Sequence, residues 1–132
     1  MESKVWQRVL GQSQPGADPG LGALLRELLI QEQLYRKWGR EELLRRQQES
    51  IAIARGIARI LGQRVDPHPA PVTATAEQCY PRTARLMAEF AARAAVPEVG
   101  LLFQALETKM KEQCVALAKL LGTEGRRGKS GE

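Results

Sequence analysis

Apolar residues recur every three or four positions in four separate stretches of this 132-residue chain. In the first stretch, Leu21, Leu24, Leu25 and Leu28 follow this spacing, which places them on one face of a helix. Glycine or proline separates each stretch from the next. The sequence therefore predicts an all-α protein with helices at residues 21–38, 41–61, 75–94 and 97–121.

Several residues at the ends of these stretches are typical of helix termini. Gly62 follows the second stretch, at the position where a left-handed residue closes a helix. Thr75, with Gln78 three residues later, matches a capping box at the start of the third stretch. Pro81 predicts that the third helix restarts or kinks at that residue. Pro97 is favoured at a first helical position, so the fourth helix is predicted to open there.

The four helices are predicted to pair as two antiparallel hairpins. In an antiparallel pair, the numbers of facing residues have a constant sum, and such a register brings apolar residues together in both hairpins. In the first hairpin, Leu28 faces Ile51 and Glu32 faces Gln47. In the second hairpin, three pairs share one sum: Phe90 with Phe103, Thr83 with Met110, and Cys79 with Cys114.

The linker at residues 63–74 determines how the hairpins are joined. It contains three prolines, and its twelve residues reach roughly 37 Å in an extended polyproline conformation at ~3.1 Å per residue. A twenty-residue helix is only ~30 Å long. The linker is therefore predicted to run the length of an antiparallel four-helix bundle as one long crossover, although a surface loop has the same composition.

Two further segments flank the predicted bundle domain at residues 21–122. Residues 1–20 are predicted to form a short helix followed by a loop rich in Gly and Pro. Four apolar residues cluster in this helix: Val5, Trp6, Val9 and Leu10. They either cover their own bundle or dock on a second subunit. Residues 123–132, after a closing Gly122, are predicted to be a disordered tail.

The chain has few residues suited to catalysis or metal binding. Its only histidine, His68, lies between two prolines of the linker, and nucleophilic triads or zinc sites need further imidazoles or thiolates. The net charge of +5 comes from basic residues mixed with acidic ones, without stacking aromatics, which argues against nucleic-acid binding.

No apolar run approaches the ~20 residues of a membrane span. We therefore expect a cytoplasmic protein that is not an enzyme. The arginine bias and the absence of Asn suit a thermophile or a GC-rich genome.

Residues 86–121 resemble the second hairpin of ferritin-like and rubrerythrin-like proteins. The resemblance is carried by an Ala-rich helix end, a Leu-rich close, and the motifs Pro97-Glu98-Val99 and Leu102-Phe103. Residues 24–62 are similar to the first hairpin of these families. The resemblance implies a four-helix bundle. It also implies a two-metal site, held by a Glu from each of two helices and a Glu-x-x-His from each of the others.

The chain departs from this family pattern at the metal ligands. Where the resemblance implies Glu-x-x-His, the second predicted helix offers Gln47-x-x-Ser50, and the fourth offers Glu107-x-x-Met110 or Met110-x-x-Gln113. Glu32 and Glu107 are then the carboxylates left to hold a metal, and two carboxylates without imidazole make a poor di-iron site. We therefore expect no bound metal and no cofactor, with Glu32 and Glu107 as the ligands of any metal that does bind.

Two sets of side chains within the predicted helices have more than one interpretation. Four polar residues form a predicted core polar layer: Glu32, Gln47, Thr83 and Gln113. In one interpretation, some of them point outward or they hydrogen-bond one another and fix the helix register. In the other, they mark an altered ligand cavity. Cys79 and Cys114 form a predicted pair of buried thiols, a disulfide, or a redox or metal site.

The sequence thus predicts a non-catalytic, ferritin-like bundle that acts through protein–protein contacts, as a homodimer or as part of a larger assembly. One alternative is a ferritin-like metal-binding protein with an atypical ligand set around Glu32 and Glu107. A second alternative is a helical adaptor or chaperone that binds an amphipathic segment of a partner.

Overall fold

The computed structural model describes residues 20–64 and 73–130, and for residues 123–130 it describes the backbone alone. The described residues form four helices: α2 (Leu21–Trp38), α3 (Glu41–Ile60), α4 (Ala76–Arg93) and α5 (Gly100–Ser130). They contain no strand, so the all-α class and the four long helices are confirmed. The short helix predicted near the N-terminus and most of the linker, including His68, lie outside the described residues.

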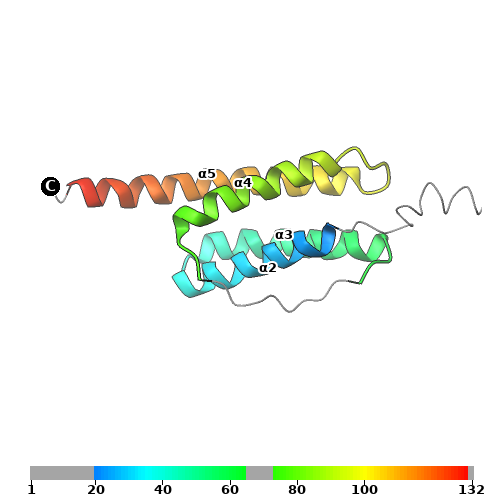
Figure 1. Cartoon of the computed structure of the whole chain (residues 1–132), viewed down its shortest axis with the longest axis horizontal. Coiled ribbons are helices and arrows are strands. Elements are labelled where there is room, and N and C mark those ends of the chain that lie inside the picture. Colours follow the sequence, from blue (N-terminus) through cyan, green and yellow to red (C-terminus); the bar gives the residue numbers. More distant parts are fainter. Residues whose placement is uncertain (1–19, 65–72, 131–132) are drawn as a thin grey trace, which may run out of the picture.

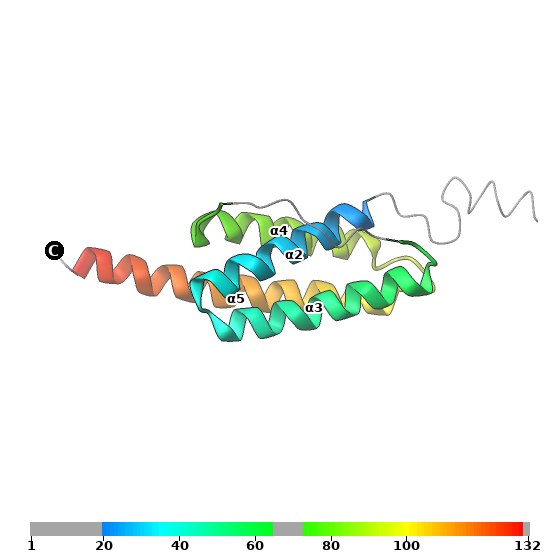
Figure 2. The same ribbon diagram turned by 90° about the horizontal axis from the view of Figure 1, so that it is seen from below.

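The four helices lie side by side with their long axes roughly aligned (Figure 1). The most extensive packing joins α4 to α5, followed by α2 to α3 and α3 to α5. α5 is the longest helix and projects beyond the other three (Figure 2). α3 ends and α4 begins at opposite ends of this array. Residues 65–72 between them are not described, so the crossover stays a prediction.

α2 and α3 end in the same way, at glycines in the left-handed conformation. Gly39 and Gly62 have φ angles of 70° and 68°, which residues with a Cβ rarely adopt. The N–H of Gly62 donates to the Arg59 carbonyl at 3.0 Å, and the N–H of Gln63 donates to the Ala58 carbonyl at 2.8 Å. This pair of bonds is a Schellman motif, and it confirms the helix-closing role predicted for Gly62.

α4 begins with the predicted capping box. The Thr75 hydroxyl accepts a hydrogen bond from the Gln78 N–H at 3.3 Å, and the Gln78 side chain accepts one from the Thr75 N–H at 3.0 Å. Pro81 lies inside α4 without ending it. Of the two predicted outcomes, the restart of the helix is therefore wrong, and the kink stays a prediction. The missing N–H of Pro81 leaves the Glu77 carbonyl without its helical donor. Both residues are exposed, so water can take that place.

α5 begins three residues later than predicted, at Gly100 rather than Pro97. The first helical bond runs from the Phe103 N–H to the Val99 carbonyl at 3.0 Å, and residues 97–99 form a turn before it. A Cβ at Gly100 would overlap the carbonyl oxygen of Ala94. The close approach of two backbone segments therefore requires a glycine at the start of α5.

α5 also ends later than predicted, because its backbone stays helical through Gly122 to Ser130. The prediction of a disordered tail from residue 123 is therefore corrected for the backbone of residues 123–130. The φ angle of Gly122 is not positive, so this glycine does not adopt the conformation that closes α2 and α3. A glycine inside a helix costs only about 1 kcal/mol relative to alanine, which a long helix tolerates.

The core consists of two clusters of apolar side chains. The larger one draws on all four helices, with Leu28, Ile57, Phe90 and Phe103 among its fully buried members. The rings of Phe90 and Phe103 stack with their centroids 6.3 Å apart, as the register of the second hairpin predicts. The smaller cluster surrounds Tyr35. Each helix in the described ranges is too short or too polar to cross a membrane.

Candidate functional site

Five polar side chains are buried inside the helix array, and each of the four helices contributes at least one. They are Gln31 on α2, Gln47 and Ser50 on α3, Thr83 on α4, and Gln113 on α5. All five are inaccessible to solvent. The structure therefore places three of the four predicted members of the core polar layer inside the protein: Gln47, Thr83 and Gln113.

The fourth predicted member, Glu32, does not belong to this layer. Its carboxylate is 19% exposed and pairs with Arg36, one helical turn later, at 3.6 Å. Gln31 takes the inward position instead, because it lies three residues after Leu28 and four before Tyr35, both fully buried. The spacing from Leu28 and Tyr35 in the sequence indicates Gln31 at this position, whereas the register with Gln47 predicts Glu32.

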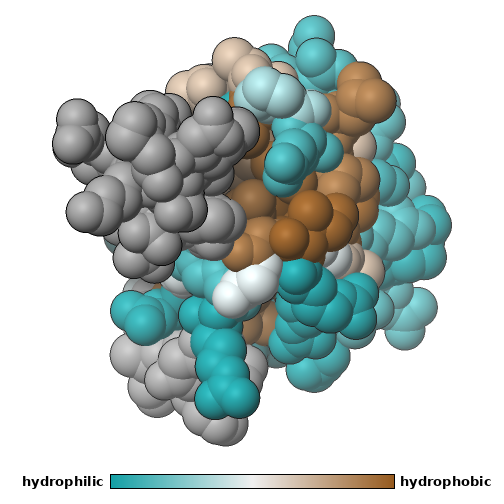
Figure 3. Space-filling model, turned by 90° about the vertical axis from the view of Figure 1, so that its right-hand side faces the viewer, coloured by the Kyte–Doolittle hydropathy of each residue, from teal (hydrophilic) through white to brown (hydrophobic). Residues whose placement is uncertain are grey.

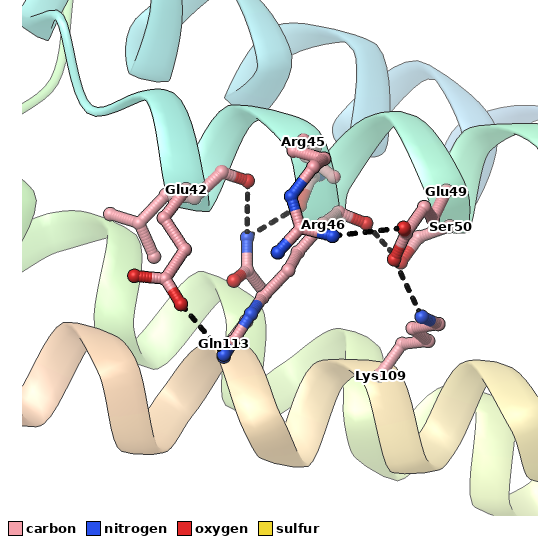
Figure 4. Close-up of polar contacts among 9 residues, drawn as sticks. Glu42, Arg45, Arg46, Glu49, Ser50, Lys109 and Gln113 are labelled. Atoms are coloured by element: carbon pink, nitrogen blue, oxygen red, sulfur yellow. Dashed lines mark hydrogen bonds and ion pairs between the residues drawn. The ribbon is translucent and has the colours of Figure 1, made fainter.

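The amides of Gln113 and Gln47 connect three helices, and Figure 4 shows Gln113 between α5 and α3. Gln113 Nε2 donates to the Leu43 carbonyl at 3.0 Å and to Gln47 Oε1 at 3.3 Å. Gln47 Nε2 donates in turn to the Leu28 carbonyl at 2.9 Å. Gln113 Oε1 is buried and has no hydrogen-bond partner among the described residues. A buried acceptor without a partner destabilises the folded state by about 1–3 kcal/mol. This loss offsets part of the stability that the hydrogen bonds of Gln113 contribute.

A second polar network joins α2 to α4. The Arg82 guanidinium donates two hydrogen bonds to the Glu27 carboxylate, from Nε at 2.7 Å and from Nη2 at 2.6 Å. Gln31 Nε2 donates to the same carboxylate at 2.7 Å. Gln31 Oε1 accepts from the Thr83 hydroxyl at 2.9 Å and from the Tyr35 hydroxyl at 3.4 Å. The hydrogen bond to Glu27 raises the pKa of Arg82, so the guanidinium stays charged.

Cys79 and Cys114 are buried, unlinked thiols. Burial raises the pKa of Cys79 to about 11, and it raises the pKa of Cys114 as well. Burial also raises the pKa of Tyr35, with a further contribution from the nearby Cys79. All three groups are therefore neutral at pH 7, and the two thiols pack as small apolar side chains.

The two carboxylates predicted as the ligands of any bound metal are not joined by other ligand side chains. Glu32 pairs with Arg36, and Glu107 is half-buried on α5. In the described part of the chain, no three or more His, Cys, Asp or Glu side chains are grouped so that they can hold a metal ion. The polar groups that do meet in the core are mainly amides and hydroxyls.

Ion pairs cover the outer face where α3 meets α5 (Figure 4). Lys109 on α5 donates to the Glu49 carboxylate on α3 at 2.7 Å, and this hydrogen bond lowers the pKa of Glu49. Glu49 also pairs with Arg45 at 3.3 Å, and Glu42 pairs with Arg46 at 3.0 Å. Exposed pairs of this kind contribute little to stability individually.

A groove of about 700 Å³ lies between α4 and α5 on the surface, and we call it the α4/α5 groove. Its apolar lining comes from both helices: Tyr80, Ala84 and Met87 on α4, and Cys114, Val115 and Ala118 on α5. Tyr80 is 39% exposed and Val115 is 52% exposed. Lys111 and Lys119 also line the groove, and none of the lining residues whose side chains the structure describes is acidic. The groove therefore combines an apolar floor with positive charge.

No protein-family model matches this chain, and no curated protein or solved structure shows significant similarity to it. The ferritin-like resemblance therefore stays a prediction from the residues of the chain.

Proposed function

We propose that this protein is a non-catalytic, ferritin-like helical bundle that acts by binding a partner helix in the α4/α5 groove. The observation that carries the proposal is the exposure of Tyr80 and Val115 in a groove where both charged lining residues with described side chains, Lys111 and Lys119, are basic. Large apolar side chains exposed together favour burial against a partner. The helix order supports the bundle proposal, since a crossover would have to connect the end of α3 to the start of α4 at the opposite end.

The dimensions of the α4/α5 groove suit a short amphipathic helix. Its lining on α5 extends from Lys111 to Gly122, which corresponds to about 16 Å at 1.5 Å per residue, or about three helical turns. On α4, Tyr80, Ala84 and Met87 continue one face at helical spacing. The partner helix therefore needs apolar residues at positions three and four apart over about three turns.

The charge of the groove defines the flanks of this partner helix. Lys111 and Lys119 are exposed, and they lie eight residues apart on the same face of α5. Acidic side chains beside the apolar stripe of the partner would pair with them. Such complementary charges select the partner and its orientation more than they increase its affinity.

The same charges argue against a homodimer formed through this groove. In a two-fold antiparallel dimer centred on Val115, Lys111 would face the partner's Lys119, and the two ammonium groups would repel each other. The sequence predicts either a homodimer or contacts with another protein partner. The groove favours a different partner that carries acidic residues.

A synthetic amphipathic peptide tests this proposal directly. The probe is a labelled helical peptide of about 14 residues with a Leu/Ala face and Glu flanks, and the control peptide carries Lys in place of Glu. By fluorescence anisotropy we expect the acidic peptide to bind at least about tenfold more tightly than the basic one. Replacing both groove lysines with glutamate (Lys111→Glu, Lys119→Glu) should reverse this preference.

A matched pair of surface variants locates the binding site. Val115→Asp places a charge in the groove and should abolish binding of the acidic peptide, whereas Leu101→Asp, at a residue of α5 that is 80% exposed and outside the groove, should leave it unchanged. Binding should also slow alkylation of Cys114, which lines the groove. Equal affinities for the two peptides, or an unchanged affinity in Val115→Asp, would contradict the proposal. Self-association that Val115→Asp abolishes would replace it with a homodimer.

A further inference from the structure

The five large apolar side chains that are exposed in the described ranges fall in two places. Tyr80 and Val115 line the α4/α5 groove. Ile60 is the last residue of α3, Val96 lies between α4 and α5, and Leu101 is the second residue of α5. These helix ends meet at one end of the array (Figure 1), and Figure 3 shows apolar surface gathered there. We call Ile60, Val96 and Leu101 the apolar end.

The chain enters the helix array beside this apolar end. α2 starts on the side of the array where α3 finishes and where α4 connects to α5 (Figure 1). Leu21, its first residue, is fully buried, and Leu24 packs against the larger core cluster. The 19 residues that precede Gly20 are therefore attached next to an exposed apolar surface.

We propose that residues 2–10 dock on the apolar end of their own chain. The sequence of this segment supplies the complementary surface, because Trp6 and Leu10 lie four residues apart, as do Val5 and Val9. Both pairs therefore fall on the same side of a helix. A helix of nine residues is marginal in water by itself, so contact with an apolar surface is what would stabilise it.

The length of the connection allows this contact. Residues 11–19 reach up to about 30 Å when extended at ~3.3 Å per residue, whereas packed helices lie only about 8–10 Å apart. The segment can therefore cover any part of the apolar end. Attachment to the same chain gives it an effective concentration in the millimolar range, which favours it over the same segment of a second copy.

The fluorescence of Trp6 reports on this docking. Trp38 is the other tryptophan, and its ring packs edge-on against Tyr35, so Trp38→Phe keeps an aromatic ring there and leaves Trp6 as the only tryptophan. In this variant we expect a blue-shifted emission and several-fold weaker acrylamide quenching than in a synthetic peptide of residues 1–12. Adding Leu101→Asp should raise the quenching to the value of the peptide. Adding Val115→Asp, in the groove, should leave the quenching unchanged.

Two results would overturn the docking of this segment on its own chain. One is that acrylamide quenches Trp6 in the Trp38→Phe protein as strongly as in the free peptide, or that adding Leu101→Asp leaves this quenching unchanged. The other is protection of Trp6 that disappears on about hundredfold dilution, which would place the contact in a second copy. If Trp38→Phe weakens the helical circular dichroism, comparing wild type with Trp6→Phe isolates the Trp6 signal instead. Since Val115→Asp tests only the groove, the two proposals fail independently.

Discussion

Gln113 and Gln47 hold the positions of α5, α3 and α2 relative to one another through bonds to backbone carbonyls. A slip of one helical turn would move each donor about 5.4 Å from its acceptor. A core of leucine and alanine alone tolerates such a slip more easily, because one small apolar layer resembles the next. The buried amides therefore serve as register-fixing contacts, the first of the two interpretations that the sequence allows.

The two cysteines lead to a prediction at the same scale. Because the pKa of Cys79 rises from 9.0 to about 11, its thiolate fraction at pH 8 is about a hundredfold lower than for an ordinary thiol. We expect iodoacetamide to modify native Cys79 slower by at least that factor, and to modify Cys114 first, since it lines the groove. Mass spectrometry of the alkylated protein measures both rates.

The raised pKa of Cys79 also predicts how stability depends on pH. Burial favours the neutral thiol in the folded state, so its contribution is complete below pH 9.0 and is lost as the pH rises through about 11. Cys79→Ala should remove this alkaline loss of stability in thermal melts.

The cysteines are expected to be free thiols. Titration of denatured, unreduced protein should find two free thiols per chain, and finding none would show a disulfide instead.

At the scale of the helix, the ends of the elements depend on a few local contacts. Gly39 and Gly62 close α2 and α3 in the left-handed conformation, whereas Gly122 stays within α5 without closing it. The difference shows that a glycine permits a helix to end but does not force it to. Pro81 shows the same for proline, because α4 continues through it at a point where both Pro81 and Glu77 are exposed.

Glycine substitutions separate these roles. Gly39→Ala should destabilise the protein by about 1–2 kcal/mol, because a Cβ is strained at a φ of 70°. Gly56→Ala, inside α3 with open space around the new Cβ, should stabilise it by about 0.5–1 kcal/mol. Urea denaturation measures both changes. Equal effects of the two substitutions would argue against a left-handed Gly39.

At the scale of the whole molecule, α3 against α5 is the extensive backbone contact between the α2–α3 pair and the α4–α5 pair. α2 and α4 are not among the extensively packed helix pairs. The Arg82–Glu27 pair and the bond from Thr83 to Gln31 join them directly. This polar network adds to the apolar side chains of α2 and α4, which belong to the same two core clusters.

A double-mutant cycle on Glu27 and Arg82 tests this connection. The two side chains are 22% and 29% exposed, so solvent partly screens their charges. We expect Glu27→Gln and Arg82→Gln each to destabilise the protein by about 1–2 kcal/mol, with a coupling of about 1 kcal/mol in the double variant. The coupling should shrink in high salt. Additive effects in the urea titrations would show that the pair does not join the hairpins.

The sequence by itself determined the helical class, the positions of most helix ends, and the inward direction of Gln47, Thr83 and Gln113. These features follow from spacing and capping, which act within one or two turns of the chain. Only the tertiary structure decided that the Thr83 hydroxyl meets Gln31 across 52 residues. It also decided that Arg82 meets Glu27 across 55 residues. Moving one residue along a helix rotates the side chain by about 100°, so contacts between separate helices depend on rotations that no local pattern fixes.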